Sequence, residues 1–238
     1  LPIWIQINNM KLLAKSFLYI LLLPFACTNS QATNENYTNS QTIQLTKRNT
    51  MKHIDDDIRE IINRLVKSGF YDKNRLFTIF HEEMYAPNEL DPNRLRQVID
   101  ELVQQHQRDK ATWEHVTDND RLTSAFKELN ELGIIALENA GYTQSDGYDD
   151  VLSIVKRSSN PSKYLGYCFY HSQDMDRGIQ GLGLYLGFGS IDPQKEETVG
   201  IEVGQKIVET LHKHGLKTQW NGTFNQRIQI VDFTWQRR

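Results

Sequence analysis

The chain has 238 residues, of which 39% are hydrophobic and 24% are charged, and its formal net charge is −3. Proteins that bind nucleic acid through phosphates concentrate lysine and arginine, and because this chain has no such excess we expect no nucleic-acid partner. Its two cysteines, Cys27 and Cys168, have no spacing typical of zinc ligands, so we expect no metal site and no disulfide framework.

The first 50 residues are predicted to lie outside the fold. Lys11 and Lys15 precede an apolar stretch at 17–26, a layout typical of a secretory signal over residues 1–27. Cys27 at its end resembles the lipidation site of bacterial lipoproteins, although Pro24 stands where that pattern prefers leucine. Residues 28–50 are rich in Asn, Thr, Ser and Gln, which predicts a flexible polar tether.

Two locations are consistent with this leader. If residues 1–27 act as a signal, we expect a periplasmic or cell-envelope lipoprotein that touches the membrane only through a lipid on Cys27. If translation starts at Met51, the sequence MKHIDDDIREII begins a cytoplasmic protein. In both cases residues 51–238 are predicted to form one domain.

The first half of that domain is predicted to be helical. Apolar residues recur at three- and four-residue steps over 55–68 and again over 73–84. Asp91 followed by proline predicts the start of a third helix, and Asp118 or Asp120 is expected to cap a fourth that ends at Gly133.

The second half alternates strands and helices. Residues 133–141 form a strand or a late helical turn, and a helix follows over 148–157. Strands are predicted at 164–171, 181–189, 216–220 and 226–235, with a helix at 199–214 and a turn at Asn221-Gly222. Helices first and mixed elements later predict an α+β fold with a mixed, mainly antiparallel sheet and packed helices.

The glycine-rich run GIQGLGLYLGFG is a strand and not a nucleotide-binding loop, so we expect no cofactor. After Gly181 and Gly183, Leu186 stands where a dinucleotide fingerprint needs its third glycine. Alternation places the leucines on one face and the glycines with Tyr185 on the other. A bare strand face favours close packing by a helix, another backbone or a ligand.

His171 is expected to project from a strand end, where a turn carries Gln173 and Asp174. A histidine beside a carboxylate can act as a general base or hold a metal ion. One histidine with one or two aspartates falls short of a metal-ligand set, and no motif names a nucleophile. Asp174 can equally serve as a turn or capping residue.

Three segments, NAGYTQSDG, GYCFYHSQD and WNGTFNQRIQI, resemble those of an uncharacterised bacterial family, a domain of unknown function, over residues 52–238. The resemblance assigns no reaction. It implies that one surface gathers the polar and aromatic residues of these segments, namely Tyr142, Asp146, His171, Gln173, Asp174, Trp220 and Arg227.

Two functions therefore remain open. The first is a binding or interaction protein, a tethered lipoprotein of immunity type, whose partner is a protein or a small polar ligand. The second is a hydrolase in which His171 acts as general base, Asp174 orients it and Arg227 binds an anion.

Overall fold

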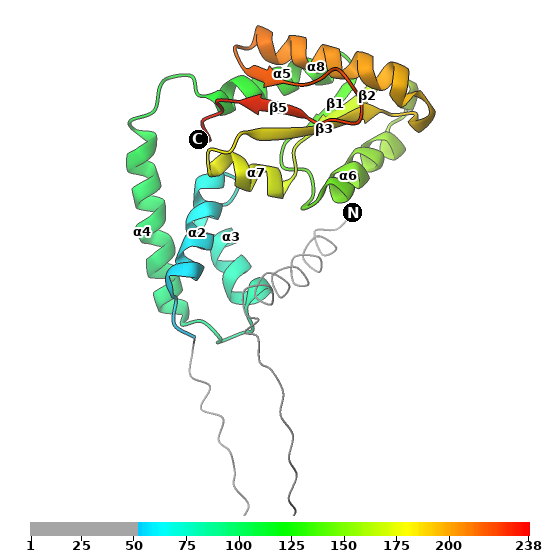
Figure 1. The fold of residues 1–238 in the computed structure, drawn as a ribbon. Helices are drawn as coiled ribbons and strands as arrows, with labels where there is room; N and C mark the ends of the chain where they lie inside the picture. The colour runs from blue at the N-terminus through cyan, green and yellow to red at the C-terminus, as the bar shows by residue number, and fades with distance from the viewer. Residues whose placement is uncertain (1–51) are drawn as a thin grey trace, which may run out of the picture.

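The computed structural model describes residues 52–238, so the leader, Cys27 and the tether lie outside the described residues. Three helices stand beside a layered part built on a five-stranded sheet (Figure 1). No helix within 52–238 has both the length and the apolar character needed to cross a membrane. The α+β class, with a helical first half and a mixed sheet after it, is confirmed.

The helical part forms because aspartates begin its helices and apolar stripes join them. The side chains of Asp55, Asp72 and Asp91 each accept a hydrogen bond from a backbone N–H in the first turn of the helix that follows. The apolar faces then pack on one another as a separate core. Its elements are α2 (Asp56–Ser68), α3 (Lys73–Thr78), the π-helical turn η1 (Ile79–Met84) and α4 (Pro92–Lys110).

The sheet has the strand order β1-β2-β3-β5-β4. β1 and β2 are parallel, and the other three pairs are antiparallel, as expected for a mainly antiparallel sheet. The strands are β1 (Ile134–Leu137), β2 (Gly166–Phe169), β3 (Leu184–Ser190), β4 (Lys217–Gln219) and β5 (Ile228–Val231).

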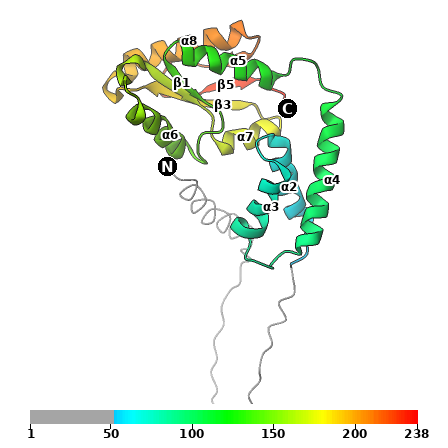
Figure 2. The same ribbon diagram turned by 180° about the vertical axis from the view of Figure 1, so that it is seen from behind.

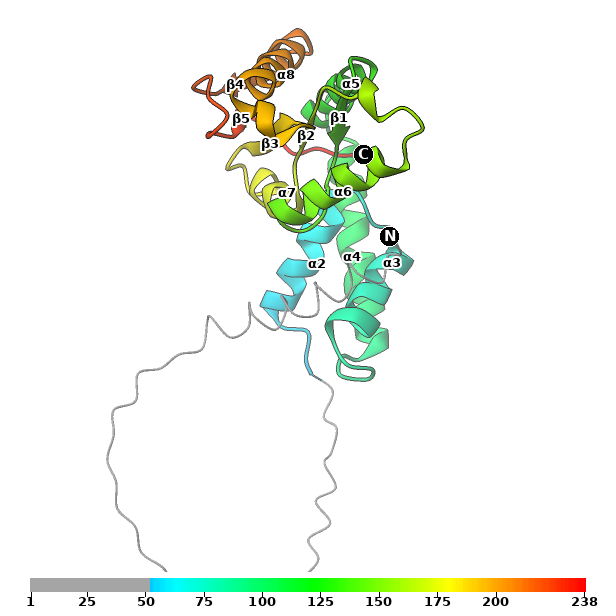
Figure 3. The same cartoon turned by 90° about the vertical axis from the view of Figure 1, so that its right-hand side faces the viewer.

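Helices cover both faces of the sheet. α5 (Asp118–Glu131) and α8 (Ile201–Lys213) lie on one face, whereas α6 (Gln144–Arg157) and α7 (Ser172–Ile179) lie on the other (Figures 1 and 3). Short helical turns complete the chain: η2 (Pro161–Lys163), η3 (Pro193–Lys195) and η4 (Glu196–Gly200), which leads into α8.

Several local predictions were wrong. The strand predicted at 181–189 begins at Leu184, after two glycines of positive φ, and the one predicted at 226–235 covers only Ile228–Val231. The helix predicted at 148–157 begins at Gln144, because Thr143 caps it.

The strand predicted at 164–171 ends at Phe169, and the turn expected after it is the helix α7. The reason is that His171 caps this helix, which ends the extended conformation. The cap of α5 is Thr117, whose hydroxyl accepts the N–H of Asp120, and not Asp118 or Asp120.

The bare face of β3 is filled by close side-chain packing. Leu184 and Leu186 are fully buried on the other face of the strand, as the alternation predicts. A side-chain carbon added at Gly187 would lie 3.2 Å from the ring of Phe169, and one at Gly189 would lie 2.7 Å from the hydroxyl of Tyr167. Aromatic side chains of β2 therefore occupy the space that the glycines leave, together with the carboxylate of Glu196, which lies 2.6 Å from a carbon added at Gly189.

Residues 232–238 run back toward the helical part, and their end lies near α2 (Figure 2). The indole N–H of Trp235 donates to the carbonyl of Lys67, 3.0 Å away, at the end of α2. Arg237 pairs with Glu138, which follows β1, and stacks over Phe70. This segment ties α2 to the sheet.

Candidate functional site

The parallel strands β1 and β2 end at the same edge of the sheet, and each leads into a helix that starts with a capping box. In α6 the pair is Thr143 and Asp146, and in α7 it is His171 and Asp174. Each aspartate accepts the backbone N–H of its cap residue, at 2.9 Å for Asp146 and 3.3 Å for Asp174. The two helix starts bring the NAGYTQSDG and FYHSQD motifs together.

Both ring nitrogens of His171 face Asp174. Nδ1 accepts the backbone N–H of Asp174 at 3.4 Å, and Nε2 lies 3.0 Å from its Oδ2. The His171 side chain is only 6% exposed. Burial lowers its pKa, and the charge of Arg227 acts in the same direction, while Asp174 opposes the shift. In this arrangement the imidazole is a neutral helix cap, with no nitrogen directed at solvent.

Arg227 holds the carboxylate of Asp174 from the other side. Its Nη1 donates to Oδ1 at 3.0 Å, and its Nη2 donates to Oδ2 and to the carbonyl of Tyr185. The Asp174 side chain is 3% exposed and that of Arg227 is 28% exposed. The carboxylate is thus a buried charge with a two-point partner, and the guanidinium is fixed in position at the surface.

A second arginine, Arg177, lies near the ring of Tyr185, as Arg227 does. The guanidinium carbon of Arg177, in the last turn of α7, lies 5.2 Å from the centre of the Tyr185 ring, and that of Arg227 lies 5.7 Å from it. Sequence reasoning missed Arg177 because it did not expect α7 to be a helix. With the helix recognised, the four-residue step from Gln173 places both side chains on one exposed face.

The remaining residues of the expected surface divide into two groups. The hydroxyl of Tyr142 lies beside Gln173, and burial raises the pKa of Tyr142. The charge of Asp146 acts on His171. These residues therefore join His171, Asp174 and Arg227 around the start of α7.

Trp220 does not join them. It follows β4, packs edge-on against Phe188 at 5.4 Å between ring centres, and covers Gly204 of α8. Its indole N–H donates to the carbonyls of Thr223 and Gln226. Because α8 and α7 cover opposite faces of the sheet, Trp220 lies on the far side and closes the loop before Arg227.

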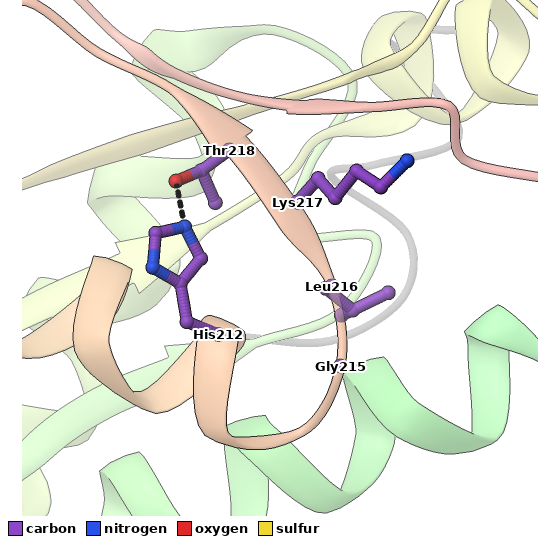
Figure 4. A pocket seen from close by; sticks show the side chains of 5 residues that line it. All are labelled: His212, Gly215, Leu216, Lys217 and Thr218. Atoms are coloured by element: carbon purple, nitrogen blue, oxygen red, sulfur yellow. Dashed lines mark hydrogen bonds between the residues drawn. The ribbon is translucent and has the colours of Figure 1, made fainter.

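The surface hollows near α8 are separate from this network. One, of about 310 Å³, is open to solvent, and in it Nε2 of His212 lies 2.8 Å from Oγ1 of Thr218 (Figure 4). The other lies between α5 and α8 and includes Glu128 and Lys213. Neither hollow is lined by His171, Asp174 or Arg227. Within 52–238, no three His, Cys, Asp or Glu side chains converge as metal ligands.

Comparison with known proteins bears out the family resemblance. No curated protein and no solved structure matches the chain. A family model described as a domain of unknown function, DUF6891, matches residues 51–238, the whole of the part expected to fold. The chain belongs to the DUF6891 family.

Proposed function

We propose that this protein is a binding module that recognises another protein through the exposed side of α7. We name this region the α7 surface, and it comprises Tyr142, Gln173, Arg177, Tyr185 and Arg227. The observation that carries the proposal is the contrast between the buried network and its surroundings. The polar atoms of His171 and Asp174 are engaged with one another, with the backbone and with Arg227, whereas Gln173 and Arg177 are exposed.

The network supports binding because it fixes the surface in advance. A bidentate arginine–carboxylate pair and a capped helix start hold α7 and the chain before β5 in one arrangement. Side chains that are already ordered lose less conformational entropy when a partner binds. Tyrosine and arginine are also among the residue types enriched at the positions that contribute most to protein–protein affinity.

A hydrolase needs a different arrangement. A general base requires a ring nitrogen within hydrogen-bond reach of a substrate proton. His171 does lie within reach of Asp174, as that alternative requires, but both of its nitrogens face Asp174 and its side chain is 6% exposed. The geometry therefore favours the binding function.

A site-specific photo-crosslinking experiment tests the proposal. A photoreactive phenylalanine analogue replaces Gln173 in the full-length protein, expressed in cells of its source organism, and the control replaces Lys206, an exposed residue of α8 on the opposite face. We expect a discrete protein adduct only at position 173. The purified partner should then bind the Tyr142→Ala variant roughly tenfold more weakly, a loss of about 1.4 kcal/mol.

Two results would overturn the proposal. One is equal crosslinking at positions 173 and 206, which would mean that α7 has no specific partner. The other is turnover of a substrate that is lost in the His171→Gln variant while the thermal stability of that variant is unchanged.

A further inference from the structure

We infer that the partner presents an acidic segment to the α7 surface, with a carboxylate seated between Arg177 and Arg227 over the ring of Tyr185. This inference rests on the proposed binding function and names the chemistry of the partner. Two guanidinium groups lie within 6 Å of one tyrosine ring, at 5.2 and 5.7 Å from its centre.

The charges of the two arginines are not equally balanced. Arg227 is neutralised by Asp174. Arg177 is exposed, and within 52–238 no carboxylate lies within ion-pair distance of it; the nearby Asp176 pairs with Arg64 at 3.5 Å. The site therefore carries one unbalanced positive charge beside a second, fixed guanidinium. A carboxylate from a partner supplies the missing counter-charge and fits the planar donors of Arg177. Arg227, whose Nη1 and Nη2 donors are engaged with Asp174 and the carbonyl of Tyr185 except for one N–H of Nη1, adds a fixed positive charge beside it.

The surroundings match the centre of a protein interface. Leu182 is 52% exposed, and its backbone N–H donates to the carbonyl of Arg177 at 3.0 Å, which places an apolar side chain at the end of α7. Tyr185 is half-buried, and both guanidinium groups lie near its ring. Tyrosine and arginine are enriched at protein interfaces relative to the rest of the surface, and the exposed leucine adds apolar area beside them.

The net charge of the protein favours recognition of an acidic segment by local contacts with the two arginines over long-range attraction of polyanions. The whole chain carries a charge of −3, so long-range electrostatics do not draw polyanions toward it. A single unbalanced arginine is also far fewer than the phosphate contacts that nucleic-acid binding requires. A protein segment that combines carboxylates with apolar side chains fits this patch best.

The chain offers a matched control for the test. Arg177 and Arg157 are both exposed arginines in the last turn of a helix, and α7 and α6 lie on the same face of the sheet. Among the residues that the structure describes, Arg157 bonds only to the carbonyl of Ser153. Charge reversal at the two positions changes the net charge of the protein by the same amount.

Fluorescence anisotropy with a fluorescein-labelled peptide of alternating glutamate and leucine, at low ionic strength, measures binding by the full-length protein. We expect saturable binding that weakens roughly tenfold in Arg177→Glu and is unchanged in Arg157→Glu. Tyr185→Leu should weaken binding as well. The same peptide with glutamine in place of glutamate should not bind. Thermal unfolding of each variant verifies that it is folded.

Three outcomes would overturn the inference: no binding of the glutamate peptide, equal weakening by the two charge reversals, or tighter binding of a single-stranded oligonucleotide than of the peptide. The failure of the inference is distinguishable from that of the proposed function. A crosslink at position 173 that persists when the acidic peptide fails to bind keeps the binding function and removes only the acidic partner.

Discussion

Asp174 and Arg227 lie 53 residues apart in the chain and meet in a two-point ion pair that joins α7 to the segment before β5. The pair also encloses His171, whose Nε2 lies 3.0 Å from the same carboxylate. This relationship gathers segments from two distant motifs and holds the start of α7 in place.

Replacing Arg227 with methionine should destabilise the fold strongly. The substitution leaves the carboxylate of Asp174, which is 3% exposed, without its charge partner. Removing one member of a buried pair costs about 3–5 kcal/mol, because a buried charge is left uncompensated. We expect a loss near the lower figure, since Arg227 is partly exposed, and urea denaturation measures it.

Arg59 provides the control for this prediction. Its ion pair with Glu101 has the same chemistry, but the two side chains are 39% and 41% exposed. Arg59→Met should therefore cost only about 0–1 kcal/mol. Equal losses in the two variants would show that the Asp174–Arg227 pair contributes no more than a surface contact.

The sequence was most informative where local signals decide the structure. The spacing of apolar residues predicted α2, α4 and α8, and aspartate caps and glycines marked several of their ends. These features depend on neighbours within a few residues. The alternation was read correctly over β3 for the same reason, but not at Leu182, which precedes the strand between two glycines of positive φ and is 52% exposed.

The sequence was least informative about α7. This helix has eight residues and contains Gly178, so its intrinsic helix propensity is low. Packing against α2 and β3 supplies its stability, and the capping box of His171 and Asp174 fixes its start. An aspartate three residues after a cap is a readable signal, but histidine is not a common cap residue.

Which residues meet at the site depends on the order of the strands in the sheet, and local sequence patterns do not encode that order. Arg227 reaches Asp174 because β5 pairs with β3, and β3 pairs with β2. The family resemblance grouped the motifs, yet it did not separate the two faces of the sheet. Trp220 follows a strand of three residues, too short for alternation to assign its face.

Asn130 should protect the outer edge of β1 from pairing with another strand. Its side-chain amide accepts the N–H of Ala136 and donates to the carbonyl of Ala136, both at 3.1 Å. An uncovered edge strand is a template for association. The amide also donates to the carbonyl of Phe126 at 2.8 Å. We expect Asn130→Ala to lower stability by about 2–3 kcal/mol, roughly 1 kcal/mol for each of the three lost bonds. We also expect concentration-dependent association, which light scattering detects.

Asn130→Asp separates the accepted bond from the donated ones, since a carboxylate accepts the N–H of Ala136 but cannot donate to the carbonyls of Ala136 and Phe126. We expect an intermediate loss of stability. Asn93→Ala, at an exposed position of α4, controls for a surface Asn-to-Ala change. An Asn130→Ala protein that stays monomeric at high concentration would contradict the protective role.

Trp235 should be the principal link between the helical part and the sheet. It packs edge-on against Tyr170, with ring centres 5.9 Å apart, and its indole N–H bonds to the carbonyl of Lys67. Trp235→Phe removes the hydrogen bond and part of the ring contacts, and it should cost about 1–2 kcal/mol. Trp235→Ala also removes the packing and should cost about 3 kcal/mol.

The region in which Trp235→Ala speeds hydrogen exchange shows whether Trp235 links the two parts or acts as an ordinary core residue. Hydrogen exchange followed by mass spectrometry should show faster exchange in α2 in the Trp235→Ala variant, because the indole that is lost bonds to the end of α2. We expect little change in α8, which covers the face of the sheet opposite to α7. Uniform acceleration across both helices would argue against a specific role in joining the two parts.

His106 should make the protein less stable in mild acid. It is buried in α4, with ring centres 5.4 Å from Trp113, and its Nε2 has no hydrogen-bond partner within 52–238. Burial lowers its pKa from 6.5 to about 4, and the positive charges of Lys110 and Lys67 contribute to the shift. The unfolded chain therefore binds the proton more readily than the folded protein does.

This contribution to stability is fully present above pH 6.5 and is lost progressively as the pH falls toward 4. Because each pKa unit corresponds to about 1.4 kcal/mol, the loss is on the order of 2–3 kcal/mol. Urea denaturation across this range should show that decline in the wild-type protein and a smaller one in His106→Phe. His53→Phe, at an exposed position, controls for the chemistry of the substitution. If wild type and His106→Phe lost stability equally over this range, protonation of His106 would not be a cause of acid sensitivity, and other groups would have to account for it.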